Sequence, residues 1–144
     1  MSETGRNEPS WVSAILAWPG TRFLCRLGLV SAYLVGGMTK LLDYPAAVAE
    51  QAHFGLYPPP VWAVLAIIIE LGGSILILCN RLVWLSAGAL AVLTLIATAV
   101  AENFWTMQGH ARFVAMNTLF EHIGLIAGFA MVAIIAARRD GHFS

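Results

Sequence analysis

The fold is decided by two apolar runs, VWAVLAIIIELGGSILILC (61–79) and LVWLSAGALAVLTLIATAVAE (82–102), which are separated only by Asn80 and Arg81. A helix needs about 20 consecutive apolar residues to cross the hydrocarbon core of a bilayer, and each run is about that long. A two-residue connection leaves no room for a crossover, so the two helices must be antiparallel neighbours. The stretch therefore predicts a transmembrane helical hairpin.

Similar apolar runs lie on both sides of this hairpin, at 22–42 and 114–137, and none of the four runs contains an internal proline. The sequence therefore predicts an all-α membrane protein, a bundle of four transmembrane helices. The predicted organisation has three parts: a polar N-terminal tail plus an interfacial segment (1–21), the four-helix transmembrane domain (22–137) and a short polar C-terminal tail (138–144).

The amino-acid composition supports a membrane protein. Of the 144 residues, 59% are hydrophobic and 11% are charged, whereas a soluble domain carries about 25% charged residues. So few charges could not cover a surface that faces water, and the lipid bilayer is the expected solvent. The formal net charge is zero and there is no basic run, which argues against a nucleic-acid partner.

Basic residues near the ends of the spans predict the orientation, because cytoplasmic loops carry an excess of lysine and arginine. One side of the predicted bundle has five basic residues: Arg6, Arg22, Arg81, Arg138 and Arg139. The other side has Lys40 and Arg112. This bias predicts that the N and C termini are both cytoplasmic.

Two shorter segments lie outside the four spans. The apolar stretch from Trp11 to Trp18 is too short to cross a bilayer, and its tryptophans predict a position at the membrane interface. The alanine-rich segment 45–54 is typical of a short helix, which Gly55 would end. Both a surface helix and a partly re-entrant cap are compatible with this second segment.

Polar residues inside the predicted spans are functional candidates, because charge within a bilayer is costly. Helical spacing places them on three stripes that we expect to face a common interior. The stripes are Arg26, Tyr33, Gly37 and Lys40; Ala66, Glu70, Gly73 and Ile77; Asn117, Glu121, Gly124 and Gly128. At a rise of about 1.5 Å per residue, Lys40, Glu70, Asn117 and Glu121 converge in the outer half of the bundle, while Arg26 lies near the inner end as a structural anchor.

Two roles for this predicted cluster remain open. In the first, Lys40 pairs with Glu70 or Glu121, and one of the two carboxyl groups stays protonated and relays protons. In the second, the polar side chains only hold the helices together.

No cofactor is evident in the sequence, and no metal site is predicted. His122 follows Glu121 but points about 100° away from it around the helix, so the two do not form a shared site. Cys25 and Cys79 are not part of a CxxC motif. They are either small apolar residues or a redox pair near the cytoplasmic ends of their spans.

Four motifs occur in a characteristic order and spacing. They are Gly36-Gly37-x-x-Lys40; Glu70-Leu71-Gly72-Gly73 with Leu76 and Arg81 after it; Phe104-Trp105; and Asn117-x-x-Phe120-x-x-x-Gly124. From about Arg22 to the end of the fourth span, this pattern resembles the DoxX family of small four-helix bacterial membrane proteins. Family members often have Lys-Asn where this chain has Glu121-His122, so nothing is carried over at those two positions.

The resemblance implies a multi-pass protein of the bacterial inner membrane. A related protein is the small subunit of a thiosulfate:quinone oxidoreductase, and other relatives are associated with membrane oxidoreductase complexes or oxidative stress. The positions that the resemblance carries over are Lys40, Glu70, Gly73, Arg81, Trp105 and Asn117.

These observations lead to a first hypothesis, a redox-associated subunit that binds quinone and receives electrons from a membrane or periplasmic partner. Glu70 and Glu121 would manage protons, Lys40 and Asn117 would polarise a quinone oxygen, and Trp105 would flank the ring. The second hypothesis is a non-enzymatic accessory or assembly partner in a membrane complex. A small-solute transporter is a third, which would require a homo-oligomer because four helices leave little room for a pore.

Overall fold

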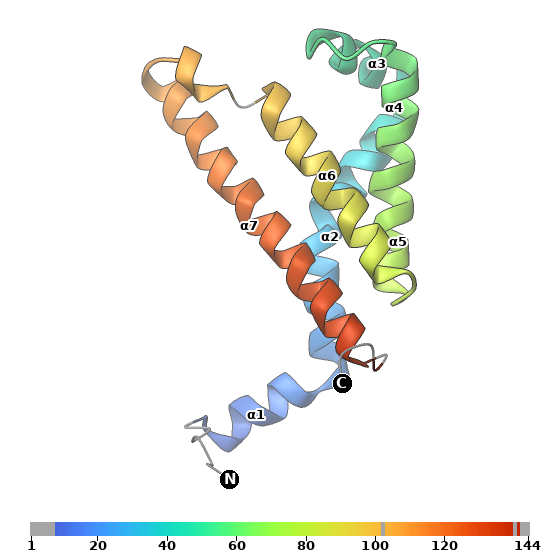
Figure 1. Cartoon of the computed structure of the whole chain (residues 1–144), viewed down its shortest axis with the longest axis vertical. Coiled ribbons are helices and arrows are strands. Elements are labelled where there is room, and N and C mark those ends of the chain that lie inside the picture. The colour runs from blue at the N-terminus through green and yellow to red at the C-terminus, as the bar shows by residue number, and fades with distance from the viewer. Residues whose placement is uncertain (1–7, 102, 140, 142–144) are drawn as a thin grey trace.

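A computed structural model describes residues 8–101, 103–139 and 141, and within these residues the chain is helical, without strands (Figure 1). The ends of the predicted polar tails, 1–7 and 142–144, and the end of the third predicted span, Glu102, lie outside the described residues. The elements in chain order are α1 (Ser10–Ala17), α2 (Pro19–Leu42), α3 (Tyr44–His53), α4 (Pro59–Ile67), the π-helical segment η1 (Ile68–Gly72), α5 (Gly73–Leu78), α6 (Val83–Ala101), the 3-10 turn η2 (Phe104–Thr106) and α7 (Gly109–Arg139).

The predicted hairpin is present. The elements α4, η1 and α5 follow one another without interruption, and α5 packs against α6 as an antiparallel neighbour (Figure 1). The chain reverses between them through Asn80 and Leu82, which have positive φ angles of 55° and 45°. Asparagine tolerates this left-handed conformation better than most residues, which suits it to so short a turn.

Within the part of the chain that the structure describes, three helical stretches are long and apolar enough to cross a membrane: Pro59–Leu78, Val83–Thr106 and Gly109–Arg139. The 24-residue helix α2 is also long enough, but it carries Arg22, Arg26 and Lys40, which lower its mean hydropathy. The all-helical membrane fold is therefore confirmed, while the fourth span stays a prediction.

The helix α7 begins at Gly109, five residues before the predicted start at Val114. Gly109 has a φ of +60°, a conformation that glycine adopts without strain, and it separates η2 from the new helix. Arg112 therefore lies in the first turn of α7 and not in a loop.

The short segments are helical. In α3, the Asp43 side chain accepts a hydrogen bond from the Ala46 amide (3.2 Å) and caps the helix, which ends before Gly55 at φ +75°. The helix lies at one end of the bundle, and α1 lies at the opposite end, to which α7 returns (Figure 1). In and beside α1, Trp11 and Trp18 are exposed, as expected of an interfacial segment.

The core lies where α2, α5, α6 and α7 meet. Its fully or almost fully buried side chains are Val30, Tyr33, Ile77, Ala87, Leu90 and Phe129. The rings of Tyr33 and Phe129 pack edge to face, with centroids 5.4 Å apart. These contacts join the first helix of the bundle to the last.

Candidate functional site

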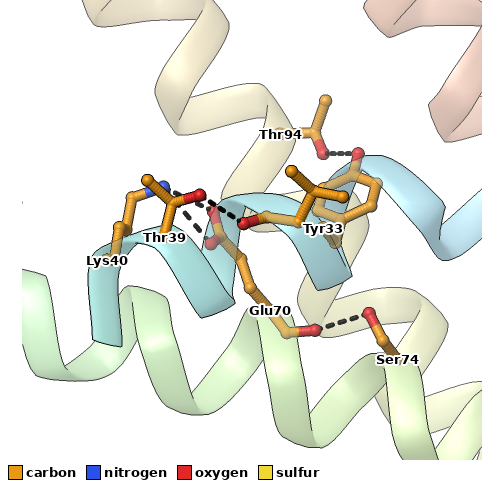
Figure 2. A network of polar contacts seen from close by, with 7 residues as sticks. Tyr33, Thr39, Lys40, Glu70, Ser74 and Thr94 are labelled. Atoms are coloured by element: carbon orange, nitrogen blue, oxygen red, sulfur yellow. Dashed lines mark hydrogen bonds and ion pairs between the residues drawn. The ribbon is translucent and has the colours of Figure 1, made fainter. Parts of the chain in front are cut away.

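An ion pair joins α2 to the π-helical segment η1. The Lys40 ammonium lies 3.2 Å from both carboxylate oxygens of Glu70 and donates to them (Figure 2). The two side chains are only 17% and 12% exposed. The predicted pairing of Lys40 with Glu70 is therefore present.

Local structure on both helices positions the Glu70 carboxylate. Glu70 is the third residue of η1, and π-helical turns within α-helices occur frequently at functional sites. The Ser74 hydroxyl donates to the Glu70 main-chain carbonyl at 2.5 Å. On α2, a Cβ on Gly37 would lie 2.7 Å from Leu71 Cγ and 3.1 Å from Glu70 Cβ, so only glycine allows the two helices to approach this closely.

Two hydrogen bonds extend the polar region toward α6 and α7. The Tyr33 and Thr94 hydroxyls lie 2.5 Å apart (Figure 2), and the Thr98 hydroxyl lies 2.7 Å from His122 Nδ1. A cavity of 230 Å³ is lined by Tyr33, Lys40, Glu70, Thr94 and His122 together with apolar side chains. Four helical stretches, α2, η1, α6 and α7, thus bring hydroxyl, imidazole, ammonium and carboxylate groups to one small space.

A second, larger cavity shares part of this lining. It has a volume of 660 Å³ and also borders on Lys40, Glu70 and His122, while most of its wall is apolar and comes from α3, α4 and α6. Its aromatic residues are Phe54, Trp62 and Trp84. Sites for small molecules usually have volumes of about 300–1,000 Å³, mostly apolar walls and a few polar groups. The cavity therefore suits an apolar molecule with one polar end.

The expectation that Asn117 and Glu121 share this site is wrong. Both are exposed, the Asn117 amide donates to the Glu121 carboxylate at 2.9 Å, and neither residue lines the two cavities beside Lys40. The helix instead turns Ala115 and Phe129 into the bundle, with His122 between them. Adjacent residues point about 100° apart on a helix, so turning the partly buried His122 inward leaves Glu121 outside.

The other predicted site residues lie apart from the Lys40–Glu70 pair. Trp105 in η2 is 66% exposed and does not line either cavity. A Cβ on Gly73 would lie 3.2 Å from Leu90 Cγ, so Gly73 serves the packing of α5 against α6. Arg26 donates to the Asn80 side chain at 3.0 Å, which ties α2 to the α5–α6 turn. Arg81 in that turn is exposed.

The cysteines and histidines do not assemble into a metal site in the described part of the chain. Cys25 and Cys79 are free and exposed. Among the residues that the structure describes, no three histidine, cysteine or acidic side chains lie close enough together to hold a metal ion.

Four residues of the polar region were not predicted as site residues: Tyr33, Thr94, Thr98 and His122. Tyr33 belongs to the polar stripe of α2, which could have identified it. Thr94 and Thr98 are four residues apart on an otherwise apolar helix, and that spacing places both hydroxyls on one face. His122 was a candidate as an ionisable residue inside a predicted span, but the sequence does not show whether it or Glu121 faces inward, because the rotation of α7 decides this.

Comparison with known proteins adds a family and a relative. The family model named DoxX matches residues 21–103, which is more than half of the chain. The chain is also 23% identical over 118 residues to the inner membrane protein YphA of Escherichia coli (strain K12), covering 82% of this chain and 84% of that protein. No solved structure matches the chain.

Proposed function

We propose that this chain, which belongs to the DoxX family and is a multi-pass protein of the inner membrane, serves a membrane oxidoreductase by binding quinone. One observation carries the proposal: the Lys40–Glu70 ion pair lies at the edge of a 660 Å³ cavity whose remaining wall is mostly apolar. A charged pair beside an apolar cavity suits a ligand that is flat and apolar but carries carbonyl oxygens.

The chemistry of a quinone fits these groups. Lys40 donates a hydrogen bond to one quinone oxygen, and Glu70 supplies or accepts a proton when the oxygen gains or loses charge. The aromatic residues Phe54 and Trp62, at the α3 end of the cavity, contact the ring, and the apolar wall along α6, as far as Trp84, receives the isoprenoid tail. Reduction to the quinol takes two electrons, which come from an oxidoreductase partner, and two protons, which Glu70 delivers one after the other and replaces from water.

The proposed topology places α2 as the fourth transmembrane helix, with both termini in the cytoplasm. The exposed arginines of the α5–α6 turn and of the end of α7 support this orientation. The Lys40–Glu70 end of the cavity then lies in the outer half of the bundle, near α3, while the cavity continues along α6 toward the cytoplasmic side, and quinone enters it from the bilayer.

The test is quinone titration of the purified protein in detergent, followed by quenching of tryptophan fluorescence. We expect Lys40→Met and Glu70→Gln to weaken binding at least tenfold, as a hydrogen bond to a charged group is worth about 1.5–3 kcal/mol. Glu121→Gln is the matched control, because it makes the same change at an exposed position on α7, and it should bind within about twofold of the wild type. Wild-type protein that fails to bind ubiquinone and menaquinone analogues would refute the proposal.

A second candidate function, an assembly partner in a membrane complex, is favoured by the Asn117–Glu121 pair. Both residues are exposed on a helix that is long and apolar enough to span the membrane. An ionisable group facing lipid costs about 2.5–3.5 kcal/mol at the bilayer centre, so cover by another protein would relieve a real penalty. Crosslinking in native membranes discriminates: a complex that survives Glu70→Gln but is lost in Glu121→Leu supports this second function.

A further inference from the structure

A third cavity lies at the opposite end of the bundle from α3, where α1, α2 and the end of α7 meet. Its volume is 280 Å³. Its lining includes three arginines, Arg22 and Arg26 from α2 and Arg139 from the end of α7. The apolar residues of the lining include Leu16 from α1 and Val132 and Ala136 from α7. Neither the proposed quinone site nor the Asn117–Glu121 pair uses this cavity.

The arginines retain unused hydrogen-bonding capacity. Arg26 donates through Nη1 to Asn80, but its Nε is buried and has no hydrogen-bond partner within the described residues. Within residues 8–101, 103–139 and 141, the ion pair of the structure joins Lys40 to Glu70 near the other end of α2. None of the three arginines of the cavity is in an ion pair with a carboxylate among these residues. A buried donor without a partner is costly, and three cations in one cavity attract an anion.

We propose that this cavity binds the phosphodiester group of an anionic phospholipid, with an acyl chain along the apolar wall. The planar guanidinium matches the geometry of phosphate oxygens and donates two parallel hydrogen bonds to them. Basic pockets between membrane helices are known to hold anionic headgroups. The position fits as well, because α1 beside the cavity exposes Trp11 and Trp18 in the manner of an interfacial helix.

The test measures lipid binding by the full-length protein with native mass spectrometry and by lipid exchange in micelles at 150 mM salt. The probes are dioleoyl phosphatidylglycerol, dioleoyl phosphatidylcholine and inorganic phosphate. The variant Arg22→Gln/Arg139→Gln removes two guanidinium groups from the cavity. Its matched control, Arg81→Gln/Arg138→Gln, removes two exposed arginines from the same end of the bundle that do not line the cavity.

We expect the wild-type protein to bind phosphatidylglycerol in preference to phosphatidylcholine. The affinity for phosphatidylglycerol should be weaker by roughly tenfold or more in Arg22→Gln/Arg139→Gln. In the control variant it should stay within about threefold of the wild-type affinity. Equal losses in both double variants would overturn the proposal, because they would indicate only general charge attraction. Competition by millimolar inorganic phosphate would identify free phosphate as the ligand and overturn the assignment to a lipid.

A second variant keeps every arginine. Ala136→Phe fills the apolar side of the cavity and should weaken phosphatidylglycerol binding at least tenfold while the protein remains monodisperse. Unchanged binding in Ala136→Phe would show that the acyl chain lies elsewhere and would overturn the proposal. Because the quinone titration does not involve this cavity, it should give the same result in all of these variants.

Discussion

The Lys40–Glu70 pair offers the sharpest test of how the bundle is held together, through a double-mutant cycle with Lys40→Met and Glu70→Gln. At the observed 3.2 Å, two unit charges attract by about 5 kcal/mol at an effective dielectric constant of 20. Desolvation offsets much of this attraction. Removing one partner leaves the other charge nearly without solvent, since the side chains are 17% and 12% exposed.

We therefore expect each single substitution to lower the free energy of unfolding by roughly 3 kcal/mol. The double variant should lose about the same as one single variant, because it leaves neither charge unpaired. The resulting coupling energy is about 3 kcal/mol.

The assay is unfolding of the purified protein in mixed micelles by increasing sodium dodecyl sulfate, followed by circular dichroism. The matched control is the cycle of Asn117→Ala and Glu121→Gln, whose hydrogen bond is exposed and should couple by less than about 1 kcal/mol. Additive losses for Lys40→Met and Glu70→Gln, with a coupling below about 0.5 kcal/mol, would refute the reasoning that the pair stabilises the fold as a unit.

Three further predictions use the same unfolding assay. Gly37→Ala should destabilise the protein by about 1–3 kcal/mol, because its Cβ would lie 2.7 Å from Leu71, whereas Gly28→Ala, which meets nothing within 4 Å, should not destabilise it. A loss in Gly28→Ala as large as that in Gly37→Ala would contradict this. Phe129→Ala should cost about 3–5 kcal/mol because Phe129 is 1% exposed in the core; a loss under about 1 kcal/mol would show that the core is packed differently. Tyr33→Phe should cost only about 1 kcal/mol, because Thr94 keeps a second bond to the Leu90 carbonyl; a loss above about 3 kcal/mol would mean that the Tyr33 hydroxyl has a larger role.

The hairpin and the membrane fold were predictable from the sequence because their causes are local. Apolar runs of the length of a bilayer, and a connection as short as Asn80-Arg81, leave few other arrangements. The pairing of Lys40 with Glu70 was predictable for a similar reason. Each residue belongs to a stripe that also contains glycine on its own helix, and a charged side chain within a bilayer requires a partner.

The rotation of α7 could not be predicted in this way. A soluble helix is oriented by the contrast between its apolar and polar faces, but in a nearly uniform apolar span that contrast disappears. The orientation of α7 was then predicted from the assumption that polar residues face the interior of the bundle. That assumption placed Asn117 and Glu121 on the inner face. Packing selects Phe129 and Ala115 instead, which brings His122 into the site and leaves Glu121 exposed. The buried hydroxyls of α6 were missed because threonine can also satisfy its hydroxyl within its own helix, as Thr94 does with the Leu90 carbonyl.

Among the four helical stretches proposed to cross the membrane, α2 is the least suited to lipid by composition, and it contributes to both proposed ligand sites. Three of its polar side chains have partners on other elements: Arg26 with Asn80, Tyr33 with Thr94, and Lys40 with Glu70. Polar groups that served only to hold helices together would need no cavity beside them. At both ends of α2, however, a cavity with an apolar wall adjoins the charged group. The low hydropathy of α2 is therefore better explained by ligand binding together with helix packing than by packing alone. This explanation requires that one set of variants weakens quinone binding and a different set weakens phospholipid binding.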